Sequence, residues 1–102
     1  MSKTKMLSLS KFICKEVQGL SEERQVFFLN WLTIHTGLEK LHEEKQLERR
    51  LNDWFYSLSI GQALEEHKLI VAEVRWCAEV SIQTLRKIAS AESLDNRRSL
   101  DE

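Results

Sequence analysis

Residues 59–89 carry the longest unbroken helical pattern in this sequence of 102 residues. Positions of one helix face recur there at alternating steps of four and three, and no proline interrupts them. The face consists of Ile60, Leu64, Val71, Val74, Ala78, Leu85 and Ile88, with His67 and Ser81 as its polar members. Ser59 and Gln62 have the spacing of a capping box, which would start the helix. The pattern predicts one long helix over 60–89, around which the rest of the chain is organised.

Three further helices are predicted before the long one. A short helix over 9–18 ends at Gly19, and a second over 22–36 begins after Ser21, a favourable N-cap residue. The second helix is apolar over most of its circumference, so we expect it to be largely buried. A third helix is predicted over 38–58.

The turn between the second and third helices has two interpretations. Gly37 can end the second helix in a left-handed conformation, or Thr36 and Glu39 can form a capping box for the third helix. Both interpretations place a tight turn at this point of the chain.

The third predicted helix has an irregular apolar pattern. Leu38 and Leu41 point in a different direction from the face that contains Leu47, Leu51, Trp54 and Leu58. We expect either that the helix bends near residues 43–45 or that its two ends pack on different neighbours.

These elements place the chain in the all-α class, as a small bundle of about four helices. We expect one domain over 9–89, a flexible N-terminus over 1–8 and a polar, disordered tail over 90–102. The predicted helices cover far more of the chain than the roughly 30–35% of an average domain, so no other fold class fits.

The charge balance and the cysteines limit the function classes. Lys and Arg number 15 and Asp and Glu 16, so the domain as a whole has no attraction for nucleic acid or anionic membranes. No apolar run approaches the ~20 residues of a membrane span. Cys14 and Cys77 lack a CxxC spacing, which favours reduced thiols and a cytoplasmic location.

Few residues are arranged for catalysis or metal binding. On a continuous helix, His35, Glu39 and His42 would share one face, but solvated polar residues around a helix start explain the same pattern. His67 lies on the core face of the long helix, where we expect a buried, hydrogen-bonded histidine. No nucleophile with a base and no glycine-rich phosphate loop is visible. We therefore expect no enzymatic activity, no metal and no cofactor.

A second apolar strip lies on the opposite side of the long helix. It consists of Leu69, Trp76 and Val80, with Glu73 among the charged residues that border it. An apolar strip with a charged rim and a central tryptophan is typical of a protein contact surface. The alternative is that another part of the chain, such as the first helix, covers the strip, and both possibilities stay open.

The sequence favours a small cytoplasmic adaptor or regulator that binds another protein, as a homodimer joined through the long helix. The partner-binding residues would be the strip and Glu73. The main alternative is a small nucleic-acid-binding regulator that uses the basic N-terminus. A solvated face is the favoured interpretation of the lysines in that segment, which are Lys3, Lys5, Lys11 and Lys15. A metal-dependent helical enzyme ranks third.

Overall fold

The computed structural model describes residues 3–90 and shows an all-α bundle, as predicted. The described residues form five helices, named in chain order: α1 (Lys3–Gln18), α2 (Glu22–Thr36), α3 (Glu44–Tyr56), α4 (Ile60–Glu79) and α5 (Ile82–Ser90). The predicted tail lies outside the described residues except for Ser90, which ends α5.

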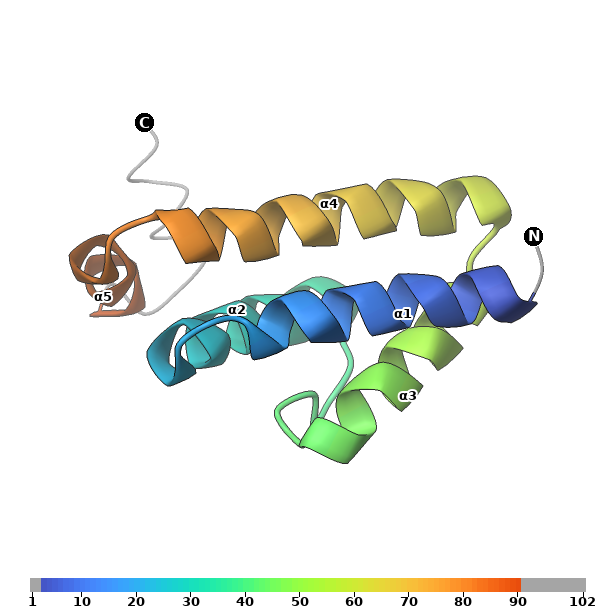
Figure 1. Ribbon diagram of the computed structural model, residues 1–102, viewed down its shortest axis with the longest axis horizontal. Coiled ribbons are helices and arrows are strands. Elements are labelled where there is room, and N and C mark those ends of the chain that lie inside the picture. Colours follow the sequence, from blue (N-terminus) through green and yellow to red (C-terminus); the bar gives the residue numbers. More distant parts are fainter. Residues whose placement is uncertain (1–2, 91–102) are drawn as a thin grey trace.

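The helices pack chiefly in the order α3, α1, α4, α2, α5. α1 and α4 lie side by side and run in the same direction, and α3 lies on the opposite side of α1 from α4 (Figure 1). α5 lies across the end of α4, where it packs against α2 (Figure 1). The four longer helices therefore form the bundle, and α5 is attached at one end of it.

One hydrophobic core joins the four longer helices. Its largest fully buried side chains are Phe28 from α2 and Phe55 from α3. The other buried members of this core are Leu9, Ile13, Val17, Leu20, Leu29, Leu32, Leu41, Leu47, Leu51, Ala63, Ile70, Val71, Val74 and Cys77. Leu85 of α5 is also buried but lies apart from this cluster. Removal of this apolar surface from water is the main force that holds the bundle together.

Local signals located the ends of two helices correctly. α2 spans 22–36 as predicted, and Gly37 follows it in the left-handed conformation with φ 74°, which confirms the first of the two interpretations of this turn. Ser59 and Gln62 form the predicted capping box at the start of α4. The first helix, in contrast, begins at Lys3 rather than at residue 9.

The predicted helix over 38–58 is wrong in its first part. Residues 37–43 form a loop, in which Lys40 has φ 61°, and α3 begins only at Glu44. Leu41 is fully buried and Leu38 packs on the core, so the loop is anchored by its own apolar residues. The change of apolar direction in the sequence therefore marks a loop, and neither a bent helix nor a continuous one is present.

The predicted continuous helix over 60–89 is also wrong, because the structure divides it. α4 ends at Glu79, Val80 is extended with ψ 150°, and α5 begins at Ile82. The Ser81 hydroxyl accepts a hydrogen bond from the amide of Thr84 at 3.1 Å, which caps the start of α5. The side chain of Arg24 in α2, which is distant in sequence, donates hydrogen bonds to the backbone carbonyls of Cys77 and Val80 at this break.

Between residues 3 and 90, no helix combines the length and the apolar character that crossing a bilayer requires.

Candidate functional site

The predicted contact strip is divided between the core and the surface. Leu69 is 47% exposed, whereas Trp76 is half-buried and packs against the core. The ring of Trp76 lies 6.1 Å from that of Phe27 in α2, measured between centroids. Val80 is half-buried at the break between α4 and α5. α2 thus lies against the tryptophan, and whether the strip binds a partner stays a prediction.

Glu73, the charged member of the predicted site, is also half-buried. Its Oε2 lies 3.8 Å from Sγ of Cys77, one helical turn further along α4. Both cysteines are thiols, as predicted, with Cys77 in the core and Cys14 half-buried in α1. Cys77 therefore has a structural position.

A largely apolar groove lies between α2 and α5, with a volume of about 250 Å³. We call it the α2–α5 groove. Its lining residues are Glu23, Val26, Phe27, Asn30, Leu85, Arg86 and Ala89. Phe27, which contacts Trp76 from the other side, connects the groove to the strip that the sequence analysis identified.

α2 is more exposed than its composition predicted. Val26 is 56% exposed and Ile34 is 62% exposed, which corrects the expectation of a largely buried helix. Two turns of α2 separate these side chains, and only Val26 lines the groove. Val26 therefore adds exposed apolar surface to the groove, which makes the groove a candidate contact surface.

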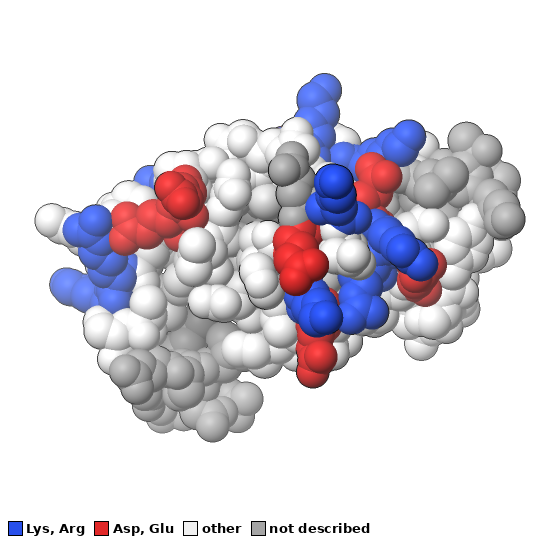
Figure 2. Space-filling model, turned by 90° about the horizontal axis from the view of Figure 1, so that it is seen from below, with Lys and Arg blue, Asp and Glu red and all other residues white. Residues whose placement is uncertain are grey.

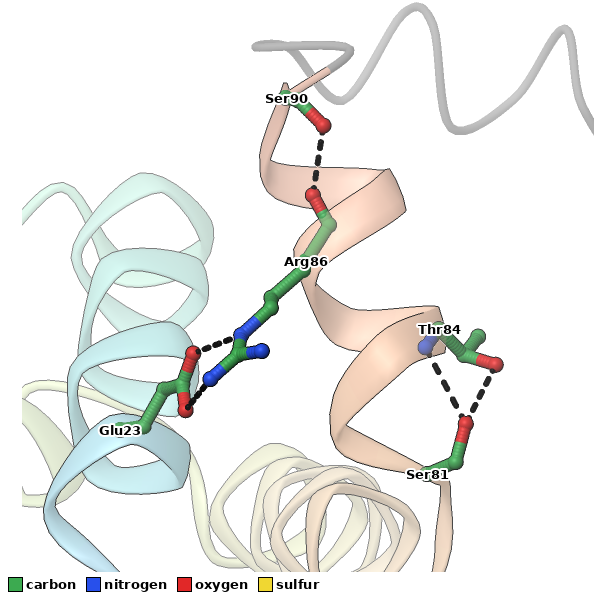
Figure 3. A network of polar contacts seen from close by, with 5 residues as sticks. All are labelled: Glu23, Ser81, Thr84, Arg86 and Ser90. Atoms are coloured by element: carbon green, nitrogen blue, oxygen red, sulfur yellow. Dashed lines mark hydrogen bonds and ion pairs between the residues drawn. The ribbon is translucent and has the colours of Figure 1, made fainter.

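Glu23 and Arg86 join the two helices across the groove. Nε and Nη2 of Arg86 donate to the two carboxylate oxygens of Glu23, at 2.7 and 3.2 Å (Figure 3). The hydrogen bond from Arg86 lowers the pKa of the Glu23 carboxyl below its ordinary value. This two-pronged geometry fixes the orientation of α5 on α2, although the pair is exposed to solvent.

A second cavity, of about 370 Å³, lies between α1, α2 and the loop before α3. It is lined by Cys14, Val17, Gln18, Gln25, Leu29, Leu41, His42 and Leu47. Burial raises the pKa of the Cys14 thiol to about 11, and the nearby Glu48 carboxylate adds to this effect. Because the thiolate is the reactive form, this cavity does not contain an activated nucleophile.

His67 differs from its prediction as a hydrogen-bonded residue. Its ring lies between Phe12 and Phe55, with centroid distances of 5.8 and 6.4 Å. Its Nε2 is buried without a hydrogen-bond partner, and burial lowers the pKa of the ring below 6.5. The surrounding aromatic rings offer no strong acceptor to Nε2, so the histidine stays neutral there.

The three residues considered for metal binding do not share a helix. His35 lies in the last turn of α2, where its Nε2 is 2.6 Å from Oε2 of Glu66, while Glu39 and His42 lie in the loop. Over the described part of the chain, no three His, Cys, Asp or Glu side chains gather in a way that could hold a metal ion.

The charged side chains are mixed in sign where α3 faces the solvent. Figure 2 shows acidic and basic groups interspersed over this face, in line with the alternating charges of the α3 sequence. Lys11 and Lys15 of α1 are exposed, whereas the side chains of Lys3 and Lys5 lie outside the described ones. Because the visible charges are mixed, this face offers no continuous track for phosphates.

Comparison with known proteins gave no relative: no family model matches the chain, and no curated protein or solved structure is similar to it. The candidate site is therefore defined by its geometry alone.

Sequence reasoning missed the α2–α5 groove. Val26 and Asn30, which line the groove, lie four positions apart on α2, but the apolar composition of this helix predicted that it is largely buried. The pairing of Glu23 with Arg86 joins residues 63 positions apart, and no local pattern predicts it.

Proposed function

We propose that this protein is a small adaptor or regulator that binds proteins and works as a homodimer, with the α2–α5 groove as the place where two copies meet. The observation that carries the proposal is the groove itself, an apolar cavity beside the exposed side chain of Val26. Apolar surface at the centre of a contact supplies affinity, and a polar rim supplies selectivity.

Charge complementarity favours a second copy as the partner. Each groove has a carboxylate, Glu23, and a guanidinium, Arg86, side by side on its rim. When a twofold axis brings the same surface of two molecules together, such a rim can match itself. We further propose a cytoplasmic location, which the two thiols support.

The test compares two matched variants on the same helix. Val26→Glu places a charge in the groove, whereas Ile34→Glu changes a similarly exposed apolar residue of α2 that does not line it. Light scattering after size exclusion should show a wild-type dimer, a monomeric Val26→Glu variant and a dimeric Ile34→Glu variant. Circular dichroism should show the same helical content in all three.

A third variant separates this proposal from the surface predicted first. Leu69→Glu changes the exposed end of the strip on α4. If Leu69→Glu dissociates the dimer and Val26→Glu does not, the strip is the contact surface and the groove is not.

A further inference from the structure

The break between α4 and α5 is confined to Val80 and Ser81. Val80 has φ −71° and ψ 150°. Its φ is already close to the helical value of about −63°, and only its ψ differs from the helical value of about −42°. Neither glycine nor proline occurs at the break. Rejoining the two helices therefore requires rotation about backbone bonds of Val80 and Ser81 alone, since Ser81, as the cap of α5, also lies outside both helices.

The hydrogen bonds at the break substitute for those of a continuous helix. In a continuous helix the amide of Ser81 would donate to the carbonyl of Cys77, and the amide of Thr84 to that of Val80. Here the guanidinium of Arg24 donates to both carbonyls, at 2.6 Å to that of Val80. The Thr84 amide donates to the Ser81 hydroxyl instead. The carbonyls of Cys77 and Val80 and the amide of Thr84 thus have partners in either state of the break.

The apolar pattern also tolerates both states. Leu85 and Ile88 keep the phase of Val74 and Ala78, so a rejoined helix would still have a single apolar face. In the structure Leu85 is only 2% exposed, because α5 is folded back on α2. Rejoining the helices would withdraw Leu85 from α2 and uncover apolar surface on both, which is unfavourable for a single molecule.

We infer that two copies of this chain exchange α5, so that the α5 helix of each copy packs on α2 of the other. This inference rests on the proposed homodimer and adds how the two copies join. Exchange recreates the buried contact of Leu85 and the pairing of Arg86 with Glu23, now between chains. Because the same contacts form in both states, exchange costs little, and a short hinge favours it.

Three variants at the break should change the stability of the dimer, two of them raising it and one lowering it. Ser81→Ala removes the cap of α5, and Arg24→Met removes the donor to the two carbonyls, so both favour the rejoined helix. Loss of the cap should favour the rejoined helix about fivefold in each chain. Because the dimer contains two chains, we expect Ser81→Ala to lower its dissociation constant roughly 25-fold. Ile82→Pro should weaken it, because proline suits the first turn of α5 but cannot lie inside a continuous helix. Ile82→Ala is the control for the lost side chain.

Charge reversal identifies which chain supplies α5. Glu23→Arg and Arg86→Glu each place two like charges together when alone. In a mixture of the two variants, a dimer with one chain of each pairs opposite charges at both α2–α5 contacts if α5 is exchanged. Such mixed dimers should then make up more than the half of all dimers that random mixing gives. One chain carries a tag, and the amount of mixed dimer is measured by co-purification at low salt, where exposed pairs are least screened. The control is a chain that carries both substitutions, because opposite charges then meet at each α2–α5 contact without a second variant.

The outcomes separate the exchange from the homodimer itself. Excess mixed dimers, with Ser81→Ala strengthening the dimer and Ile82→Pro weakening it, support the exchange. A wild-type dimer that mixes only statistically and is insensitive to the hinge variants overturns the exchange and leaves the homodimer in place. A wild type and a Ser81→Ala variant that are both monomeric at the highest soluble concentration overturn the two proposals together. If the charge-reversed chains do not fold, the hinge variants alone decide.

Discussion

His35 connects the end of α2 to α4 through Glu66, with 2.6 Å between Nε2 and Oε2. Its ring also stacks on that of Trp31, 4.8 Å away between centroids and with the planes 7° apart. The side chains of His35 and Glu66 are about a quarter exposed, at 26% and 29%. One histidine therefore combines a polar contact between helices with an aromatic contact inside its own helix.

Two substitutions of His35 should separate these contributions. His35→Phe keeps an aromatic ring beside Trp31 but removes the contact with Glu66, and should destabilise the fold by about 1 kcal/mol. His35→Ala removes both contacts and should cost about 2 kcal/mol. Urea unfolding gives both values. Equal losses in the two variants would show that the stacked ring contributes nothing.

His67 should make the protein sensitive to mild acid. Burial lowers the pKa of its ring below 6.5 in the folded state, so the unfolded chain binds the proton first as the pH falls. Stability should therefore be complete above pH 6.5 and decline below it.

His67→Leu should remove this decline and, because Nε2 has no partner, stabilise the fold by about 1 kcal/mol at pH 7. Unfolding between pH 7 and pH 5 measures both effects. His42→Gln, at an exposed position in the loop, is the matched control and should leave the pH profile unchanged. If the stability of His67→Leu still declines below pH 6.5 as in the wild type, another group causes the acid sensitivity.

Cys14 should react slowly with alkylating reagents. A pKa of about 11 instead of 9.0 leaves about a hundredfold less thiolate at pH 8, and the thiolate is the form that reacts. Iodoacetamide labelling followed by peptide mass spectrometry reports Cys14 separately from Cys77. In denaturant the same residue should react at the rate of an ordinary cysteine. Equally fast labelling of the folded protein would mean that Cys14 is not protected by burial.

Substitution of Gly37 and of Gly61 by alanine should change the stability of the fold in opposite directions. Gly37 has φ 74°, a conformation that L-residues rarely adopt, so Gly37→Ala should cost about 1 kcal/mol even though nothing blocks the added methyl group. Gly61 lies exposed in the first turn of α4, also with open space around it. Gly61→Ala should therefore stabilise the fold by about 0.5 kcal/mol. Thermal unfolding of both variants compares the two signs directly, and a loss in both would refute the conformational argument.

Local chemistry explains which helix ends could be predicted. The capping box of Ser59 and Gln62 and the left-handed Gly37 involve residues at most four positions apart, so their interactions are visible in the sequence. The loop before α3 also has a local signal, the change of apolar direction after Leu41, but that change equally fits a bent helix or a helix whose two ends pack on different neighbours. Its buried Leu38 and Leu41 resemble helix residues because they too belong to the core.

The break after Glu79 could not be predicted from local pattern. The apolar phase continues across it, and Ser81 suits either a helix interior or a cap. The decisive contact comes from Arg24, 56 positions away from Val80 in the sequence. The candidate site follows from this break, because the α2–α5 groove exists only when α5 folds back on α2.

The sequence by itself determined the all-α class, the extent of α2 and the start of α4, because helix periodicity and capping depend on neighbouring residues. The tertiary structure decided the direction of α5, the position of Trp76 beside Phe27 and the exposure of Val26. Those features depend on which helices meet in space. The apolar pattern fits a continuous and a broken helix alike, so contacts across the fold, made by Arg24, Glu23 and the buried Leu85, select the broken one.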